Sequence, residues 1–162
     1  CRETKARKRA ERLNGVYENI SKDIGIFSDR EMFLCGLFLY WGEGGKTQYT
    51  NVTVSNTDPS VLLFFITWIC LIGATREKLR VKLHIYADMD EHEEIAYWSH
   101  TLGLPASAFR KTYVKGSNRL NLTYKQRFTH GTCNVMYDNR DIGEYVHEAM
   151  RYLQETFVAS TP

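Results

Sequence analysis

The chain has 162 residues, of which 43% are hydrophobic, 25% are charged and 13% are aromatic. A chain of this length and composition can bury a sizeable core, which excludes a wholly disordered protein and favours one globular domain. The 21 Lys and Arg residues nearly balance the 19 Asp and Glu residues, so the net charge of +2 does not by itself indicate a nucleic-acid-binding protein.

The four cysteines, Cys1, Cys35, Cys70 and Cys133, show no CxxC or similar spacing, which argues against a zinc site. Cys35 and Cys70 stand in apolar runs and are predicted to be buried thiols, which fits a reducing, cytoplasmic location. The longest apolar run, residues 61–74, is too short to cross a membrane, so we expect no membrane partner.

The chain is predicted to begin with a basic helical arm or linker, residues 1–27, followed by one α+β domain, residues 28–158, and a tail, residues 159–162. The first 14 residues contain six Lys or Arg residues against two Glu residues. Two interpretations of this segment stay open: a solvated helix with ion pairs four residues apart, and a basic arm that contacts phosphate groups.

The helices of the predicted domain have recognisable start signals. Ser28 and Glu31 have the spacing of a capping box, and Asp58 is placed as an N-cap with Pro59 as the first helical residue. In chain order, the expected elements are a helix over residues 32–41, a strand over 48–55, a helix over 60–72, a strand over 80–86, a helix over 90–102, strands over 109–115, 119–128 and 131–138, and a helix over 141–157. This order predicts a mixed or antiparallel sheet covered by helices, with an antiparallel hairpin near its end.

Two sets of side chains have structural interpretations. Four aromatic residues at helical spacing are predicted to be core rather than base-stacking platforms, namely Phe64, Phe65, Trp68 and Trp98. Five acidic residues at the start of the helix over 90–102 are interpreted as complements to the helix dipole rather than as a metal cluster, namely Asp88, Asp90, Glu91, Glu93 and Glu94.

Between Glu94 and Asp138 the sequence contains no acidic residue, although the whole chain is nearly neutral. In the strands over 80–86 and 119–128, polar and apolar side chains alternate, which places the polar set on one face of a sheet. A face on which every charge is positive, with Asn and Thr between the charges, suits contacts with phosphates and base edges. The alternative is a solvated sheet edge that its positive charges protect against aggregation. The residues predicted to contact nucleic acid are Arg80, Lys82, His84, Arg110, Lys111, Lys115, Arg119, Asn121, Lys125 and Arg127.

Glu43 is the candidate for chemistry, because it stands between glycines where the helix over residues 32–41 ends. A helix dipole disfavours an anion at the C-terminus, and a divalent cation would relieve this conflict. Lys46 and Lys111 are further catalytic candidates, for supporting an attacking water. The GKT sequence that follows Glu43 lacks the spacing of a phosphate-binding P-loop.

The stretch GLFLYWGEG, residues 36–44, resembles the LAGLIDADG motif, which commonly ends in a small residue, an acidic residue and a glycine. The segment VTVSNTDP with the helix after it, and the last strand and helix, are also similar to that family, so the resemblance covers most of residues 31–153. It implies a saddle-shaped sheet that lies on double-stranded DNA, and a homodimer, since the chain holds one motif. It also implies that Glu43 holds Mg²⁺ or another divalent cation for phosphodiester hydrolysis.

Three functions stay open from the sequence. The first is a metal-dependent DNA endonuclease that acts as a homodimer. The second is a DNA-binding transcriptional regulator on the same fold, without catalytic activity. The third is a protein-interaction domain whose basic face is only solvated. We expect a cytoplasmic location, associated with the nucleoid if the protein is a bacterial regulator, or an organellar one.

Overall fold

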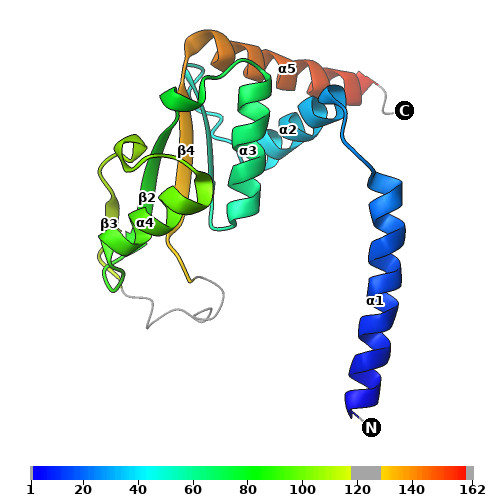
Figure 1. Ribbon diagram of the computed structural model, residues 1–162. Coiled ribbons are helices and arrows are strands. Elements are labelled where there is room, and N and C mark those ends of the chain that lie inside the picture. Colours follow the sequence, from blue (N-terminus) through cyan, green and yellow to red (C-terminus); the bar gives the residue numbers. More distant parts are fainter. Residues whose placement is uncertain (1, 118–128, 160–162) are drawn as a thin grey trace. The chain divides into compact units, whose positions relative to one another are not determined.

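The computed structural model describes residues 2–117 and 129–159 (Figure 1). The chain divides into two compact units, Cys1–Met32 and Phe33–Pro162, which are described separately. The helices and strands, in chain order, are α1 (Arg2–Ile24), α2 (Asp29–Glu43), β1 (Asn51–Asn56), α3 (Pro59–Leu71), β2 (Arg80–Tyr86), α4 (Glu91–Leu102), β3 (Tyr113–Lys115), β4 (Thr132–Asp138) and α5 (Arg140–Ala159). Short 3₁₀ turns cover Arg76–Lys78 and Ala106–Ala108.

The first unit contains α1 and the predicted capping box. The Ser28 N–H and hydroxyl both donate to Glu31 Oε2 at 2.7 Å, and the Glu31 N–H lies 3.3 Å from Ser28 Oγ, so the capping box is confirmed. These bonds, first that from the Ser28 N–H and then that from its hydroxyl, hold the pKa of Glu31 below its usual value. In α1, Arg7 and Glu11 form an ion pair four residues apart at 3.6 Å.

The second unit is built on a four-stranded sheet with the order β1-β4-β2-β3. β4 pairs antiparallel with both β1 and β2, whereas β3 pairs parallel with β2. The predicted α+β class with a mixed sheet is therefore confirmed. Parallel pairing needs a crossover connection, and α4 with its following turn supplies it between β2 and β3.

The strand predicted over residues 109–115 is wrong in its first part. Only its last three residues, Tyr113–Lys115, form β3, and Phe109 makes a single parallel bridge to Val81. Phe109 leaves the 3₁₀ turn Ala106–Ala108 beside Val81, and the Arg110 N–H donates to the Val81 carbonyl. The regular ladder with β2 begins only at Tyr113, opposite His84. The second arm of the predicted hairpin, residues 119–128, lies outside the described residues.

The core lies against the apolar face of the sheet, and the helices α2, α3, α4 and α5 all contribute buried residues to it. Phe65, Trp68 and Trp98 are fully buried, as predicted, and Phe64 is partly buried against them. Asp58 caps α3 by accepting the Ser60 N–H at 2.8 Å, with Pro59 as the first helical residue. In β1, β2 and β4, every second residue is buried in this core, namely Val52, Val54, Val81, Leu83, Ile85, Cys133, Val135 and Tyr137.

The prediction of two buried thiols is wrong for Cys35, which is exposed, and Cys70 is only partly buried. Cys35 precedes the buried pair Gly36 and Leu37 on α2, and one helical position rotates a side chain by about 100°, which is enough to turn it to the solvent. Among the helices that the structure describes, none combines the length and the apolar character that a membrane crossing requires.

Candidate nucleic-acid interface

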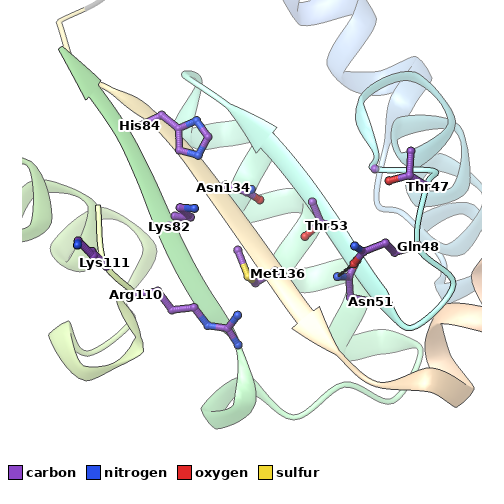
Figure 2. A pocket seen from close by; sticks show the side chains of 11 residues that line it. Thr47, Gln48, Asn51, Thr53, Lys82, His84, Arg110, Lys111, Asn134 and Met136 are labelled. Atoms are coloured by element: carbon purple, nitrogen blue, oxygen red, sulfur yellow. Dashed lines mark hydrogen bonds between the residues drawn. The ribbon is translucent and has the colours of Figure 1, made fainter. Parts of the chain in front are cut away.

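The polar face of the sheet contains a hollow of about 590 Å³ (Figure 2). Its floor comes from alternate residues of β1, β4 and β2, which are the side chains that the strand pleat directs away from the core. The lining residues are Gly45, Thr47, Gln48, Asn51, Thr53, Lys82, His84, Arg110, Lys111, Asn134 and Met136.

The side chains of this hollow are basic or neutral. Three cations supply the charge, and one imidazole, three amides, two hydroxyls and one thioether supply the rest. No carboxylate is among the lining residues that the structure describes. An anion placed in the hollow therefore meets donors and positive charge without a fixed negative neighbour on the lining.

Arg110 and Lys111 come to the hollow from the segment after the 3₁₀ turn Ala106–Ala108. The Arg110 N–H donates to the Val81 carbonyl at 2.7 Å, which fixes this segment beside β2. Arg110 Nη2 lies 2.6 Å from Asp138 Oδ2, and both side chains are about half exposed. An ion pair so exposed contributes little stability, so its main effect is to orient the guanidinium.

His84 lies on β2 between Lys82 and the β3 edge, and it lines the hollow. Burial is the main cause that holds the pKa of His84 below its usual value, and the positive charges of Lys82 and Lys115 act in the same direction. The imidazole is therefore neutral at pH 7, and the fixed charge of the hollow comes from the lysines and Arg110.

The rim at residues 44–48 is held by Tyr40, which is fully buried in α2. Its hydroxyl donates to the Gly45 carbonyl, and the Gly45 N–H donates to the Thr53 carbonyl at 2.9 Å. Burial raises the pKa of Tyr40 to about 12, against the opposing effect of a backbone hydrogen bond from Thr53. The end of α2 is thereby tied to the first strand of the sheet.

Asn134 lies at the centre of the polar face, and the sequence analysis did not identify it. In the strand register its neighbours are Lys82 on β2 and Ser55 on β1. Its Oδ1 is buried and has no hydrogen-bond partner among the described residues. Buried polar atoms are seldom left unpaired, so this oxygen is an unusual feature of the polar face. The alternation of polar residues in β4 was the signal that could have found it.

Of the ten residues predicted to contact nucleic acid, the hollow brings together four, namely Lys82, His84, Arg110 and Lys111. Arg80 is not among the lining residues, and its Nη1 donates to the carbonyls of Glu77 and Leu79 at 3.0 and 2.8 Å. Lys115 stands over the ring of Tyr86, with Nζ 4.6 Å from the ring centroid. The other four, Arg119, Asn121, Lys125 and Arg127, lie outside the described residues.

Glu43 is the last residue of α2, and it is exposed, as is Lys46. Gly45, two residues after Glu43, lines the hollow, whereas Glu43 itself is not among the lining residues. Within the described part of the chain, no group of three or more His, Cys, Asp or Glu side chains is arranged to hold a metal ion. The described residues thus offer Glu43 and helix-end carbonyls but not a closed ligand set, and a divalent cation there would need further oxygen ligands from beyond them.

A second polar cluster, also not identified from sequence, joins α4 to the start of β4. Glu94 is 6% exposed, with Oε1 3.2 Å from His130 Nδ1, and Oε2 accepts the Gly131 N–H at 2.9 Å. The His130 ring is stacked on Tyr97 at a centroid distance of 3.3 Å. The interpretation of the acidic run as a helix start holds for Asp90, which accepts the Glu93 N–H at 2.9 Å, but Glu94 has this separate role.

No protein-family model, curated protein or solved structure matches this chain.

Proposed function

We propose that the chain binds double-stranded DNA through the polar face of its sheet. The observation that carries the proposal is the hollow on that face, in which Lys82, Arg110 and Lys111 lie on the β2 side of a lining that otherwise offers amides and hydroxyls and, among the described residues, no carboxylate (Figure 2). Phosphate contacts from cations supply affinity and register, while amide side chains can pair with base edges in the major groove. The resemblance to LAGLIDADG proteins supports a saddle-shaped sheet and duplex DNA as the partner.

The three amides of the face are suited to base recognition. The side chains of Gln48 and Asn51 are hydrogen-bonded to each other at 2.9 Å, whereas Asn134 keeps a free acceptor among the described residues. Asn and Gln can pair in bidentate fashion with N6 and N7 of adenine. Asn134 lines the hollow beside Lys82 in the strand register, so we assign this side chain to base reading, and we assign the cations of the hollow to phosphate.

The catalytic part of the proposal is cleavage of the bound DNA by a homodimer. Glu43 would hold a divalent cation such as Mg²⁺ at the rim of the hollow, with the remaining ligands from a second copy and the phosphate. The cation, when bound, supplies Lewis-acid activation of water and of the scissile phosphate. Two lysines are candidates to support an attacking water. Lys46 is exposed three residues after Glu43, and Lys111 lines the hollow.

An exposed aromatic surface supports the homodimer. Phe38 is 45% exposed on α2 and Phe157 is 48% exposed on α5, with ring centroids 6.0 Å apart. Trp41 stacks on Phe38 at 6.0 Å and lies 6.4 Å from Phe157. Aromatic side chains grouped in this way are enriched at interfaces and are costly to leave in water.

A second candidate function is a DNA-binding regulator without catalytic activity. The observation that favours it is the incomplete ligand set around Glu43 within the described residues of one protomer. Both functions use the same face for DNA, and they differ only in whether the bound backbone is cut. If the basic face is merely solvated, the protein-interaction domain remains.

Salt dependence of binding tests the DNA interface. We expect affinity for a duplex to fall steeply with salt, and Lys82→Ala or Lys111→Ala to lower the slope of log K against log salt by about 0.9 each. The matched control is Arg151→Ala, which removes the same charge from α5, where Arg151 is paired with Glu148 and Glu155. Binding that ignores salt, or an equal loss in all three variants, would contradict the interface.

Cleavage is tested separately with a diverse plasmid library, in Mg²⁺ or Mn²⁺, for the parent and Glu43→Gln. We expect nicking or cutting by the parent and none by Glu43→Gln, with duplex affinity preserved in EDTA. Equal cutting by both proteins would refute Glu43 as the metal ligand, and bound but uncut DNA in every library member would favour the regulator.

A further inference from the structure

The edge of the polar face at β2 and β3 carries an aromatic pair. His84 and Tyr113 are directly opposite each other in the strand register, with ring centroids 5.4 Å apart and planes inclined by 60°. Tyr113 is 54% exposed, whereas His84 is partly buried and lines the hollow. One side of the pair is thus fixed by the sheet, and much of the tyrosine surface is open to solvent.

A second aromatic residue with a cation lies two residues further along the same strands. Tyr86 faces Lys115 in the register, and Lys115 Nζ lies 4.6 Å from the Tyr86 ring centroid. Residues two apart on a strand share one face and are spaced by about 6.6 Å. Together, His84, Tyr113, Tyr86 and Lys115 form a surface that we name the aromatic shelf, and it is continuous with the hollow through His84.

We infer that the aromatic shelf binds an unpaired nucleobase, with Tyr113 as the stacking platform. This inference rests on the proposed function and adds to it a preference for DNA that contains an unstacked base. Base pairs inside a duplex already have their faces covered by their neighbours, so among the bases of bound DNA only one that has left the stack could cover the exposed ring of Tyr113. Stacking on an aromatic ring combined with a cationic groove is the usual way in which proteins hold unpaired bases.

The alternative for Tyr113 is a solvated residue that shields an edge strand. Two observations favour the shelf. The ring is held against His84 rather than free in solvent, and Lys115 and Lys82 place positive charge on either side of it, where a nucleotide's phosphates would lie. The hydroxyl of Tyr113 plays no part in stacking, so the ring alone should carry the effect.

The experiment compares three probes of equal length, a fully paired duplex, the same duplex with one unpaired base, and single-stranded oligo-dT, for the parent, Tyr113→Ala, Tyr113→Phe and Lys111→Ala. We expect the parent to bind the bulged duplex at least about tenfold more tightly than the paired one, and Tyr113→Ala to remove this preference. Tyr113→Phe should keep it, and Tyr113→Ala should leave the salt dependence unchanged. Lys111→Ala should weaken all three probes alike.

Oligo-dT separates an unpaired base as such from a distorted duplex, because Tyr113→Ala should weaken it by about the same factor as the bulge. Equal affinity of the parent for paired and bulged duplexes, or equal losses on both in Tyr113→Ala, would overturn the inference while leaving the duplex interface standing. If the parent shows no salt-sensitive binding to any of the three probes, the proposed function itself is refuted. Thermal unfolding of each variant guards against misfolding, which would lower binding to all probes in parallel.

Discussion

Gly36 lies directly against the indole of Trp68, with no space for a side chain between α2 and α3. A Cβ built on Gly36 would be 1.9 Å from Trp68 Cδ1. The Nε1 of the same indole donates to the Phe33 carbonyl at 3.1 Å. The indole therefore contacts two residues of one turn of α2, Phe33 and Gly36. The glycine of the motif-like helix is therefore used inside the protomer, and a second copy would have to meet the opposite side of α2, where Phe38 is exposed.

Gly36→Ala is expected to destabilise the protein by about 1–3 kcal/mol, because the added methyl overpacks the contact with Trp68. The matched control is Gly42→Ala in the same helix, where a Cβ meets nothing within 4 Å. That variant should be neutral or stabilised by about 0.5–1 kcal/mol, since alanine is the better helix former. Chemical denaturation followed by circular dichroism measures both, and equal stability of the two variants would contradict the close packing.

Tyr40→Phe is expected to cost about 1–2 kcal/mol, because the Gly45 carbonyl loses its donor in a partly buried site. Its dependence on pH gives a second readout. The pKa of Tyr40 is raised from 10.0 in the unfolded chain to about 12 in the folded one, so stability present below pH 10 is lost as the pH rises toward 12. We expect a shallower loss of stability over this range in Tyr40→Phe than in the parent, measured by urea titration at several pH values.

Replacement of Glu94 by Ala is expected to destabilise the protein by about 1–3 kcal/mol, because the buried Gly131 N–H and the His130 ring lose their acceptor. Glu93→Ala, one position away on the exposed side of α4, should stay within about 0.5 kcal/mol of the parent. A double-mutant cycle with His130→Ala isolates the pair. Additive losses would mean that Glu94 acts through Gly131 alone.

Binding of DNA is expected to strengthen as the pH falls below about 6.5, the usual pKa of histidine. In the free protein, burial and then the charges of Lys82 and Lys115 hold the pKa of His84 below that value. Phosphates in the hollow would favour the imidazolium, so binding should take up a proton and affinity should rise toward acid pH. Without DNA the sign is the reverse: the lowered pKa makes folding less favourable as the pH falls through this range.

Fluorescence anisotropy with a labelled duplex between pH 5.5 and 7.5 measures this effect. His84→Gln should abolish the His84 contribution and leave a flatter profile, while Lys111→Ala should lower affinity at every pH and keep the slope. An unchanged profile in His84→Gln would show that the imidazole does not approach the phosphates.

Local signals in the sequence predicted local structure well. The Ser28–Glu31 capping box, the Asp58 cap and the strand Arg80–Tyr86 were all predicted, because each depends on residues close together in the chain or on a period of two. The site was predicted only in part. Lys82 and His84 followed from alternation, but the placing of Arg110 depends on a backbone bond to Val81, which lies 29 residues earlier.

What the sequence could not provide was the pairing between distant segments. Asn134 becomes central only because β4 lies between β1 and β2, a strand order that no local motif in the sequence encodes. Glu94 looks like any acidic residue at a helix start until the start of β4 brings Gly131 and His130 to it. The exposure of Cys35 likewise depends on which side of α2 faces Trp68.

On the proposed DNA interface, Asp138 would compete with a phosphate for Arg110. Asp138 holds the guanidinium with a carboxylate at 2.6 Å, in the place where a phosphate oxygen would bind. A DNA phosphate would have to replace the Asp138 carboxylate at the Arg110 guanidinium. The net gain from its contact with Arg110 would therefore be smaller than with an unpaired arginine. Weakly positioned anions would fail this exchange, whereas a phosphate held in register by the lysines would succeed. Because the pair is exposed and weak, this competition would lower the affinity for loosely placed polyanions and would cost a correctly placed backbone little.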